Sequence, residues 1–352
     1  MIETEPVLSI SLPAGETDRL DLATIRNPWG CSPHLPEAQM LFLDTTRDGI
    51  TQKVASWLHM DASGITLCGN GSTGIITAIP ELFMHPGDTC LIIQPTYFGF
   101  YNSLTETGMS IHEIQIPEKH GFAFNDSVYL EISDSIGRIN PALIWICNPN
   151  NPTGTVMDLQ FVSDIAISNP ETLIIVDEAH QEIIDPFNQT SVIRLISACP
   201  NIIVTKTFSK AFGLPDIRIG IAVADRAIIR TLETRAGQTE IPHQSLIRAA
   251  AALLDCGHLA VTSLRIKQEL LFVKSEIRTM NRIVLGSDSQ IGMLLVKHKN
   301  RSLFDLLQNQ GIGTDDFNAV RGLEGLEYVR IGLGCHEENV RLVNALKTCD
   351  MM

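Results

Sequence analysis

Lys210 lies in a stretch that combines an amine, hydroxyl groups and an arginine. The stretch reads TFSKAFGLPDIR from Thr207 to Arg218, and Ser209 directly precedes the lysine. A desolvated lysine near cations loses part of its ammonium character and becomes a nucleophile toward carbonyls. An arginine beside hydroxyls can hold a phosphate dianion. The stretch therefore indicates an amine that forms a Schiff base beside a bound phosphate, although a surface lysine is the ordinary alternative when it is read alone.

Two polar clusters follow apolar runs that are typical of buried strands. They are NPNNPTG at Asn148–Gly154 and VDEAH at Val176–His180. Open α/β sheets bind ligands at the carboxyl ends of their strands. There Asp177 can pair with a protonated pyridine nitrogen, and Asn151 can donate to a phenolic oxygen on the same ring. A plain turn and a helix N-cap are the alternatives for the two clusters taken singly, but the three motifs in this order favour one shared site.

Together the motifs resemble those of fold-type I pyridoxal-phosphate enzymes of the class I/II aminotransferase superfamily. The nearest branch is that of histidinol-phosphate aminotransferase and threonine-phosphate decarboxylase, and the resemblance extends from Asn27 to Arg330. It implies pyridoxal 5′-phosphate bound through Lys210. It also implies a homodimer with shared active sites, in which Asn27–Gly30 and the Phe42 region approach the partner's cofactor.

The resemblance assigns roles to further residues. Lys210, Asp177 and His180 are the expected catalytic residues. The residues expected to bind the cofactor are Gly71, Ser72, Thr73, Tyr97, Asn151, Asp177, His180, Thr207, Ser209, Lys210 and Arg218. The residues expected to bind the substrate are Asn27, Trp29, Asn151, Asp315, Asp316 and Arg330. Within these sets, the Gly/Ser turn at 69–74 opens a helix pattern that can hold an anion, and Arg330 is the expected partner of a carboxylate.

Departures from the family pattern bear on the substrate. His180, Phe42 and Trp29 each stand where relatives carry a tyrosine, and Asp315 and Asp316 stand near an arginine of the histidinol-phosphate relatives. A carboxylate in place of a cation disfavours a phosphorylated substrate, unless the two aspartates are solvated turn residues. We expect an aminotransferase, with a basic or arginine-like substrate as one possibility. Elimination or cyclisation of a modified, for example hydroxylated, arginine-like amino acid and amino-acid decarboxylation remain open.

Composition limits the classes of protein and partner. With 352 residues, 44% of them hydrophobic, the chain can form two lobes around ample cores. A net charge of −14 opposes binding to nucleic acid or to an anionic membrane. The eight cysteines lack metal-ligand spacing, which indicates reduced thiols in a cytoplasmic protein and no metal site. The acidic N-terminus lacks the basic start of a signal peptide.

Seven short apolar segments predict the strands of a mostly parallel sheet in a three-layer α/β/α large domain, with a smaller α+β domain beside it. The candidate strands are 65–68, 89–94, 113–117, 142–147, 172–177, 202–208 and 217–224. The link between the last two is too short for a crossover helix, so the last strand should run antiparallel. One long helical stretch near 244–280 and a hairpin of 282–285 and 293–297 follow. The expected division is an arm and part of the small domain at 1–44, the large domain at 45–245 and the small domain at 246–352.

Overall fold

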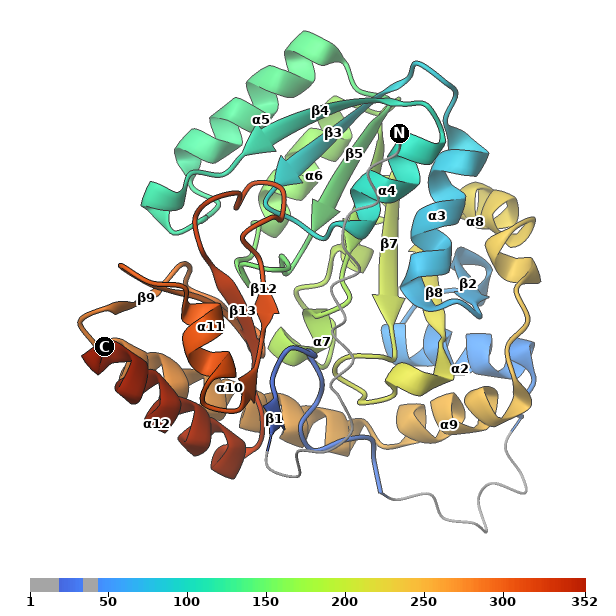
Figure 1. Ribbon diagram of the computed structural model, residues 1–352. Helices are drawn as coiled ribbons and strands as arrows, with labels where there is room; N and C mark the ends of the chain where they lie inside the picture. Colours follow the sequence, from blue (N-terminus) through green and yellow to red (C-terminus); the bar gives the residue numbers. More distant parts are fainter. Residues whose placement is uncertain (1–18, 34–43) are drawn as a thin grey trace.

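A seven-stranded sheet forms the centre of the large lobe in the computed structural model, which describes residues 19–33 and 44–352 (Figure 1). In spatial order the strands are β2 (Ile65–Cys68), β8 (Gly220–Ala224), β7 (Ile202–Thr207), β6 (Leu173–Asp177), β5 (Leu143–Cys147), β3 (Thr89–Gln94) and β4 (Ser110–Gln115). Only β8 runs antiparallel to its neighbours in this sheet; the other pairings are parallel. The predicted fold class and the reversed last strand are confirmed, whereas β4 begins three residues earlier than expected.

Helices cover both faces of this sheet, which explains why its strands are apolar on both sides. Every residue of β2, β5 and β8 is buried. One face lies under α3 (Gly71–Phe83), α4 (Gly99–Glu106) and α8 (Arg226–Glu233). The other face lies under α2 (Arg47–Leu58), α5 (Asp126–Ile139), α6 (Leu159–Ser168) and α7 (Gln181–Ile184). Short 3₁₀ turns occupy Ala62–Gly64, Glu118–His120, Val192–Leu195, Pro215–Ile217 and Ala236–Gln238.

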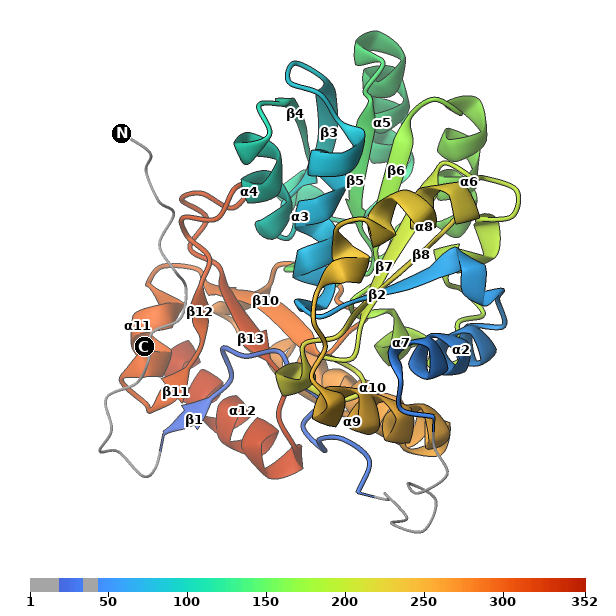
Figure 2. The ribbon, with the colours of Figure 1, turned by 90° about the vertical axis from the view of Figure 1, so that its right-hand side faces the viewer.

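The small lobe is built on an antiparallel sheet. Its strands in order are β12 (Asp315–Asp316), β13 (Val329–Gly332), β10 (Met293–His298) and β9 (Ile283–Leu285), packed with α11 (Leu303–Gln308) and α12 (His336–Met351). The expected hairpin is therefore present as β9 and β10. Figure 2 shows β1 (Leu20–Asp21) beside β11 (Ile312–Gly313), with which it pairs in parallel, so the N-terminal segment joins this lobe. The division of the chain at 44 and 245 remains a prediction.

The stretch expected to be helical over 244–280 is helical, but it is divided into two helices. It forms α9 (His243–Leu254) and α10 (Cys256–Ile277), bent by 77° at the break. The Asp255 side chain accepts the backbone N–H of His258 and so begins α10 as an N-cap. Among the residues that the structure describes, no single helix has the length and apolarity to cross a membrane, and only this bent pair meets both criteria jointly.

Candidate active site

Asp177 lies at the carboxyl end of β6, where three strand ends meet. It is level with Cys147 on β5 and Thr205 on β7. Its side chain is buried, and Oδ1 accepts a hydrogen bond of 2.7 Å from the Thr205 hydroxyl. Burial is the largest cause of the rise in the Asp177 pKa to about 6, and the Thr205 bond opposes it. The strand end thus supplies a desolvated carboxylate that a cationic partner would stabilise.

His180 follows Asp177 by three residues, in the turn that leads into α7. The side chain is buried, and its Nδ1 has no hydrogen-bond partner among residues 19–33 and 44–352. Burial, and then the charges of Lys210 and Arg330, hold the pKa of His180 well below its usual value. The imidazole is therefore neutral at pH 7 and has a ring nitrogen available to a ligand.

Lys210 lies just beyond β7, and its amine faces the N-terminal segment. Nζ donates a 3.2 Å hydrogen bond to the carbonyl oxygen of Ile25. Burial lowers the Lys210 pKa to about 8, helped by Arg330 and Arg218 and opposed by Asp177. About a tenth of this amine is thus uncharged at pH 7, and the neutral form is the state required of a nucleophile toward a carbonyl.

The start of α3 and the segment after Lys210 approach each other at two glycines. A Cβ added at Gly71 would lie 2.9 Å from Arg218 Nη2, and one added at Gly220 would lie 2.3 Å from the Gly71 carbonyl carbon. Arg218 has a φ of 52°, a left-handed conformation that is uncommon outside glycine and often marks functional sites. The guanidinium donates to the carbonyl of Asn70, the N-cap of α3, at 3.2 Å.

Four more of the residues predicted to bind the cofactor lie around the place where the start of α3 meets the segment that contains Arg218. Ser72 and Thr73 form the first turn of α3, and the Thr73 hydroxyl bonds to the Tyr97 side chain. Thr207 donates its hydroxyl proton to the Ser209 oxygen at 3.0 Å. A helix N-terminus, an arginine and hydroxyls therefore meet at one place, which suits an anion such as phosphate. Tyr97 lies near Asp177 as well, since that carboxylate contributes to the raised pKa of its phenol, behind burial.

Arg330, on β13, is bound by other residues of the site. Its Nη2 forms an ion pair with Asp315 Oδ2, and its Nη1 donates to Asn151 Oδ1 at 2.9 Å. The Arg330 carbon Cζ lies 4.7 Å from the centre of the Phe317 ring. The expected cluster of Asn151, Asp315 and Arg330 is thus brought together. Asp316 is not part of it, because it is exposed and its Oδ1 accepts the Asn318 N–H at 2.9 Å.

The N-terminal segment crosses this cluster. Asn27 is buried, and its Nδ2 donates to the carbonyl oxygen of Ala211 at 2.7 Å, while its Oδ1 accepts the Trp29 N–H at 3.0 Å. The Trp29 ring is half-buried, with the Arg265 guanidinium 5.7 Å from its centre. The Phe42 region, expected to approach a partner subunit, lies outside the described residues.

Some residues of this region were missed by the sequence reasoning. Thr205 and Thr207 project from the same face of β7. This alternation was the signal in the sequence that could have identified Thr205. The carbonyl oxygens of Ile25 and Ala23, which accept from Lys210 and Arg330, carry no signal in the sequence. Also missed was an ion cluster behind Asp177, formed by Lys206, Glu178 and Glu182, whose side chains are each 1% exposed.

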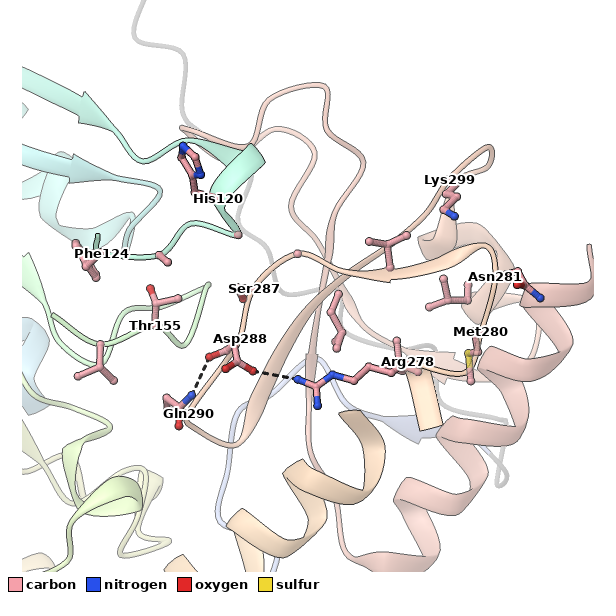
Figure 3. A pocket seen from close by; sticks show the side chains of 18 residues that line it. His120, Phe124, Thr155, Arg278, Met280, Asn281, Ser287, Asp288, Gln290 and Lys299 are labelled. Atoms are coloured by element: carbon pink, nitrogen blue, oxygen red, sulfur yellow. Dashed lines mark hydrogen bonds and ion pairs between the residues drawn. The ribbon is translucent and has the colours of Figure 1, made fainter. Parts of the chain in front are cut away.

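A separate hollow of about 780 Å³ opens between the lobes (Figure 3). It lies between segments 120–124 and 155–156 of the large lobe and residues 277–290 of the small lobe, and it contains none of the predicted site residues. Across the described ranges, 19–33 and 44–352, no three His, Cys, Asp or Glu side chains are grouped as metal ligands would be.

Comparison with known proteins places this geometry in a family. A family model described as aminotransferase class I and II matches residues 38–346. The chain belongs to the class I and II aminotransferases. The predicted resemblance to fold-type I pyridoxal-phosphate enzymes, with pyridoxal phosphate as cofactor, is confirmed by this match.

Individual relatives of this aminotransferase agree along nearly its whole length. It is 30% identical over 357 residues to the histidinol-phosphate aminotransferase of Caldicellulosiruptor saccharolyticus, with 98% of this chain and 96% of that protein aligned. The structure of histidinol-phosphate aminotransferase from Clostridium acetobutylicum superposes with a TM-score of 0.81 at 23% identity, over 94% of this chain and 99% of that one. The histidinol-phosphate aminotransferase from Sinorhizobium meliloti was solved in complex with pyridoxal-5′-phosphate. Its structure superposes with a TM-score of 0.78 at 20% identity, over 94% of this chain and 91% of that one.

Proposed function

We propose that this aminotransferase acts on an α-amino acid through Lys210, with Asp177 as the partner of the pyridine nitrogen. The observation that carries the proposal is the electrostatic pairing of the buried Asp177 at the end of β6 with the half-buried Lys210 just beyond β7, each of which shifts the pKa of the other. An amine with a pKa of about 8 beside a carboxylate with a pKa of about 6 is the combination that a carbonyl-binding, cation-stabilising site requires.

The residues present fit pyridoxal phosphate. The buried Nδ1 of His180, which lacks a partner in the described part of the chain, suits a hydrogen bond to the ring's phenolic oxygen. The Gly71 backbone leaves no room for a side chain at Gly220, and Gly71, with a φ of 70°, lies directly against the Arg218 guanidinium at the start of α3. Ser72, Thr73, Thr207 and Ser209 complete a set of phosphate-binding groups, and Tyr97 is the expected stacking partner of the ring.

The bound cofactor supplies an electron sink for the pair of electrons left on the substrate Cα. Asp177 keeps the ring nitrogen protonated, because a buried carboxylate gains most from a neighbouring cation. With the cofactor bound, the Lys210 amine would take the proton from the substrate Cα and be the group that moves it, the proton transfer that transamination requires. Arg330 and Asn151 receive the α-carboxylate, and Asn27 and Trp29 line the side of the site formed by the N-terminal segment.

The identity of the donor is proposed from charge. The relatives named above are histidinol-phosphate aminotransferases, so a phosphorylated amino alcohol is one candidate. Asp315 is a negative group inside the site, and it favours the other candidate, a basic amino acid. The same charge would suit elimination or cyclisation of a modified arginine.

We propose, in addition, a homodimer whose two subunits complete each other's sites, as the family resemblance implies. Sedimentation velocity at micromolar concentration tests this. A single boundary at twice the chain mass agrees with it, and a fully active monomer contradicts it.

Product analysis by mass spectrometry tests the reaction. The purified protein would be given a panel of acidic, neutral, basic and phosphorylated amino donors, with and without 2-oxoglutarate. Transamination predicts an oxo product that accumulates only when the acceptor is present, and Lys210→Ala should form none. A product that accumulates equally without the acceptor would replace transamination by elimination, cyclisation or decarboxylation.

A further inference from the structure

Asp315 and Arg330 directly oppose each other on the antiparallel strands β12 and β13. Directly opposed residues project from the same face of a sheet, so the two side chains are brought together by the register itself. They form an ion pair in which the side chains are 11% and 14% exposed. Asp316 is opposite Val329 and projects from the other face. Asp315 is therefore a fixed part of the site, and its neighbour in sequence is not.

Three N–H groups of Arg330, including both on Nη2, have partners, whereas its buried Nε has none in the described part of the chain. A guanidinium has five N–H groups, and it can bind a carboxylate with two hydrogen bonds through Nε and Nη2 or through Nη1 and Nη2. Nη2 takes part in both arrangements. In Arg330 the two Nη2 hydrogens go to Asp315 and, at 3.5 Å, to the carbonyl oxygen of Ala23. Nη1 donates to Asn151. A substrate carboxylate can therefore form two hydrogen bonds with Arg330 only if it replaces Asp315 or Ala23 as the acceptor of an Nη2 N–H.

The electrostatic result is the same whether the substrate carboxylate replaces Asp315 or Ala23 as the acceptor. If the substrate displaces Asp315, a buried carboxylate loses its counter-ion. If Asp315 stays, two carboxylates share one guanidinium. In each case the site contains one more buried negative charge than Arg330 neutralises, which is unfavourable in a low-dielectric place. A cation on the donor side chain restores the balance, whereas a phosphate adds to the excess.

We propose that Asp315 is a specificity-determining residue that selects amino donors with a cationic side chain and rejects phosphorylated or acidic ones. The inference rests on the proposed transamination at Lys210. It assigns to Asp315 the role of an internal carboxylate ligand that weakens the attraction of Arg330 for anions. Discrimination of this kind comes from a repulsive group as much as from an attractive one.

Pairs of donors that differ mainly in charge test the proposal. The pairs are L-arginine with L-citrulline, and L-histidinol with L-histidinol phosphate, compared by kcat/KM in the holoenzyme. The wild type should prefer L-arginine and L-histidinol by about tenfold or more, and Asp315→Asn should reduce both preferences by about tenfold. Asp316→Asn is the matched control and should leave both ratios unchanged. A wild type that prefers histidinol phosphate, or an Asp315→Asn variant that behaves as Asp316→Asn does, overturns the proposal.

A binding measurement separates this inference from the reaction. Glutarate is a dicarboxylate without an amino group, so its calorimetric dissociation constant does not depend on turnover. Asp315→Asn should bind glutarate about tenfold more tightly than the wild type, and Asp316→Asn should not. Equal affinities in all three proteins would contradict the role of Asp315. If none of the four donors reacts with the wild type, the proposed function fails, while the glutarate constants still decide the role of Asp315.

Discussion

The hydroxyl of Thr205 donates a 2.7 Å hydrogen bond to Asp177, and both residues are buried at adjacent strand ends. The bond favours the charged form of the carboxylate and so opposes the effect of burial on the Asp177 pKa. Thr205 therefore acts through Asp177, the proposed partner of the ring nitrogen, and we regard it as a positioning residue.

Removal of this hydroxyl should weaken catalysis more than binding. We expect Thr205→Val to lower kcat by about 10-fold to 100-fold, since a hydrogen bond to a charged group contributes roughly 1.5–3 kcal/mol. KM should change less, and the acid limb of the pH profile should move to higher pH because the pKa of Asp177 rises. Thr205→Ser retains the hydroxyl and is the control. Equal loss of activity in both variants would indicate a packing defect instead.

Asp177 should destabilise the cofactor-free protein at neutral pH. The folded pKa of about 6 exceeds the ordinary aspartate value of 3.8, so ionisation opposes folding, and the difference corresponds to about 3 kcal/mol. The penalty is complete above pH 6, shrinks as the pH falls through 6, and vanishes below about 4, where the folded and unfolded states are both protonated.

Asp177→Asn removes this penalty and can still accept the Thr205 hydrogen bond. We expect the cofactor-free variant to be more stable than the wild type in urea unfolding at pH 8, by an amount that disappears near pH 4. It should also lose transaminase activity by orders of magnitude, because the ring nitrogen loses its partner. A variant that is less stable at pH 8 would show that the Asp177 carboxylate is better solvated than its burial indicates.

The strands that carry these groups could be predicted from the sequence because each begins with an apolar run, 173–176 in β6 and 202–204 in β7. The break between α9 and α10 was missed because Asp255 lies in an otherwise helical pattern, and only its bond to the His258 N–H identifies it as an N-cap. The candidate residues Lys210, Asp177 and Asn151 could be found from motifs. The pairing of Asp315 with Arg330 could not, since it depends on the register of two strands 15 residues apart.

Lys210 should be the site of cofactor attachment. Sodium borohydride treatment of the holoenzyme should fix the cofactor irreversibly to the peptide that contains Lys210. Lys206 is the nearest alternative in sequence, but its amine is held by two carboxylates, which raise its pKa against the effect of burial. Recovery of the label on the Lys206 peptide would refute the assignment of the site.

The pH dependence of attachment follows from the Lys210 pKa of about 8. Cofactor uptake by the cofactor-free protein should accelerate with pH and reach half its maximal rate near pH 8, because only the neutral amine attacks the aldehyde. After burial, Arg330 is the largest cause of the lowered pKa. Arg330→Gln should therefore move the midpoint to higher pH. An unchanged midpoint in that variant would show that the two cations do not interact.

The buried ion cluster behind Asp177 should be costly to break, because removal of one partner leaves uncompensated charge in the interior. Lys206 Nζ lies 2.7 Å from Glu178 Oε2 and 2.8 Å from Glu182 Oε1, and it donates to Asn188 Oδ1 at 2.9 Å. Glu178 also accepts the Ser191 hydroxyl at 2.5 Å and a backbone N–H at 2.7 Å. The cluster thereby fixes the turn that begins with Asp177, and Lys206 is its central cation.

Lys206→Met keeps most of the side-chain volume and removes the charge. Two carboxylates then remain buried without a counter-ion, and we expect a loss of about 3–5 kcal/mol in the free energy of unfolding at pH 7.5. The loss should diminish as the pH falls, because protonation of Glu182, whose pKa is raised by burial, removes uncompensated charge. Lys206→Met combined with Glu182→Gln should recover part of the loss. Lys299→Met, at an exposed lysine, is the control and should stay within roughly 0.5 kcal/mol of the wild type. A Lys206→Met protein whose loss is independent of pH would mean that packing, not charge, makes the lysine necessary.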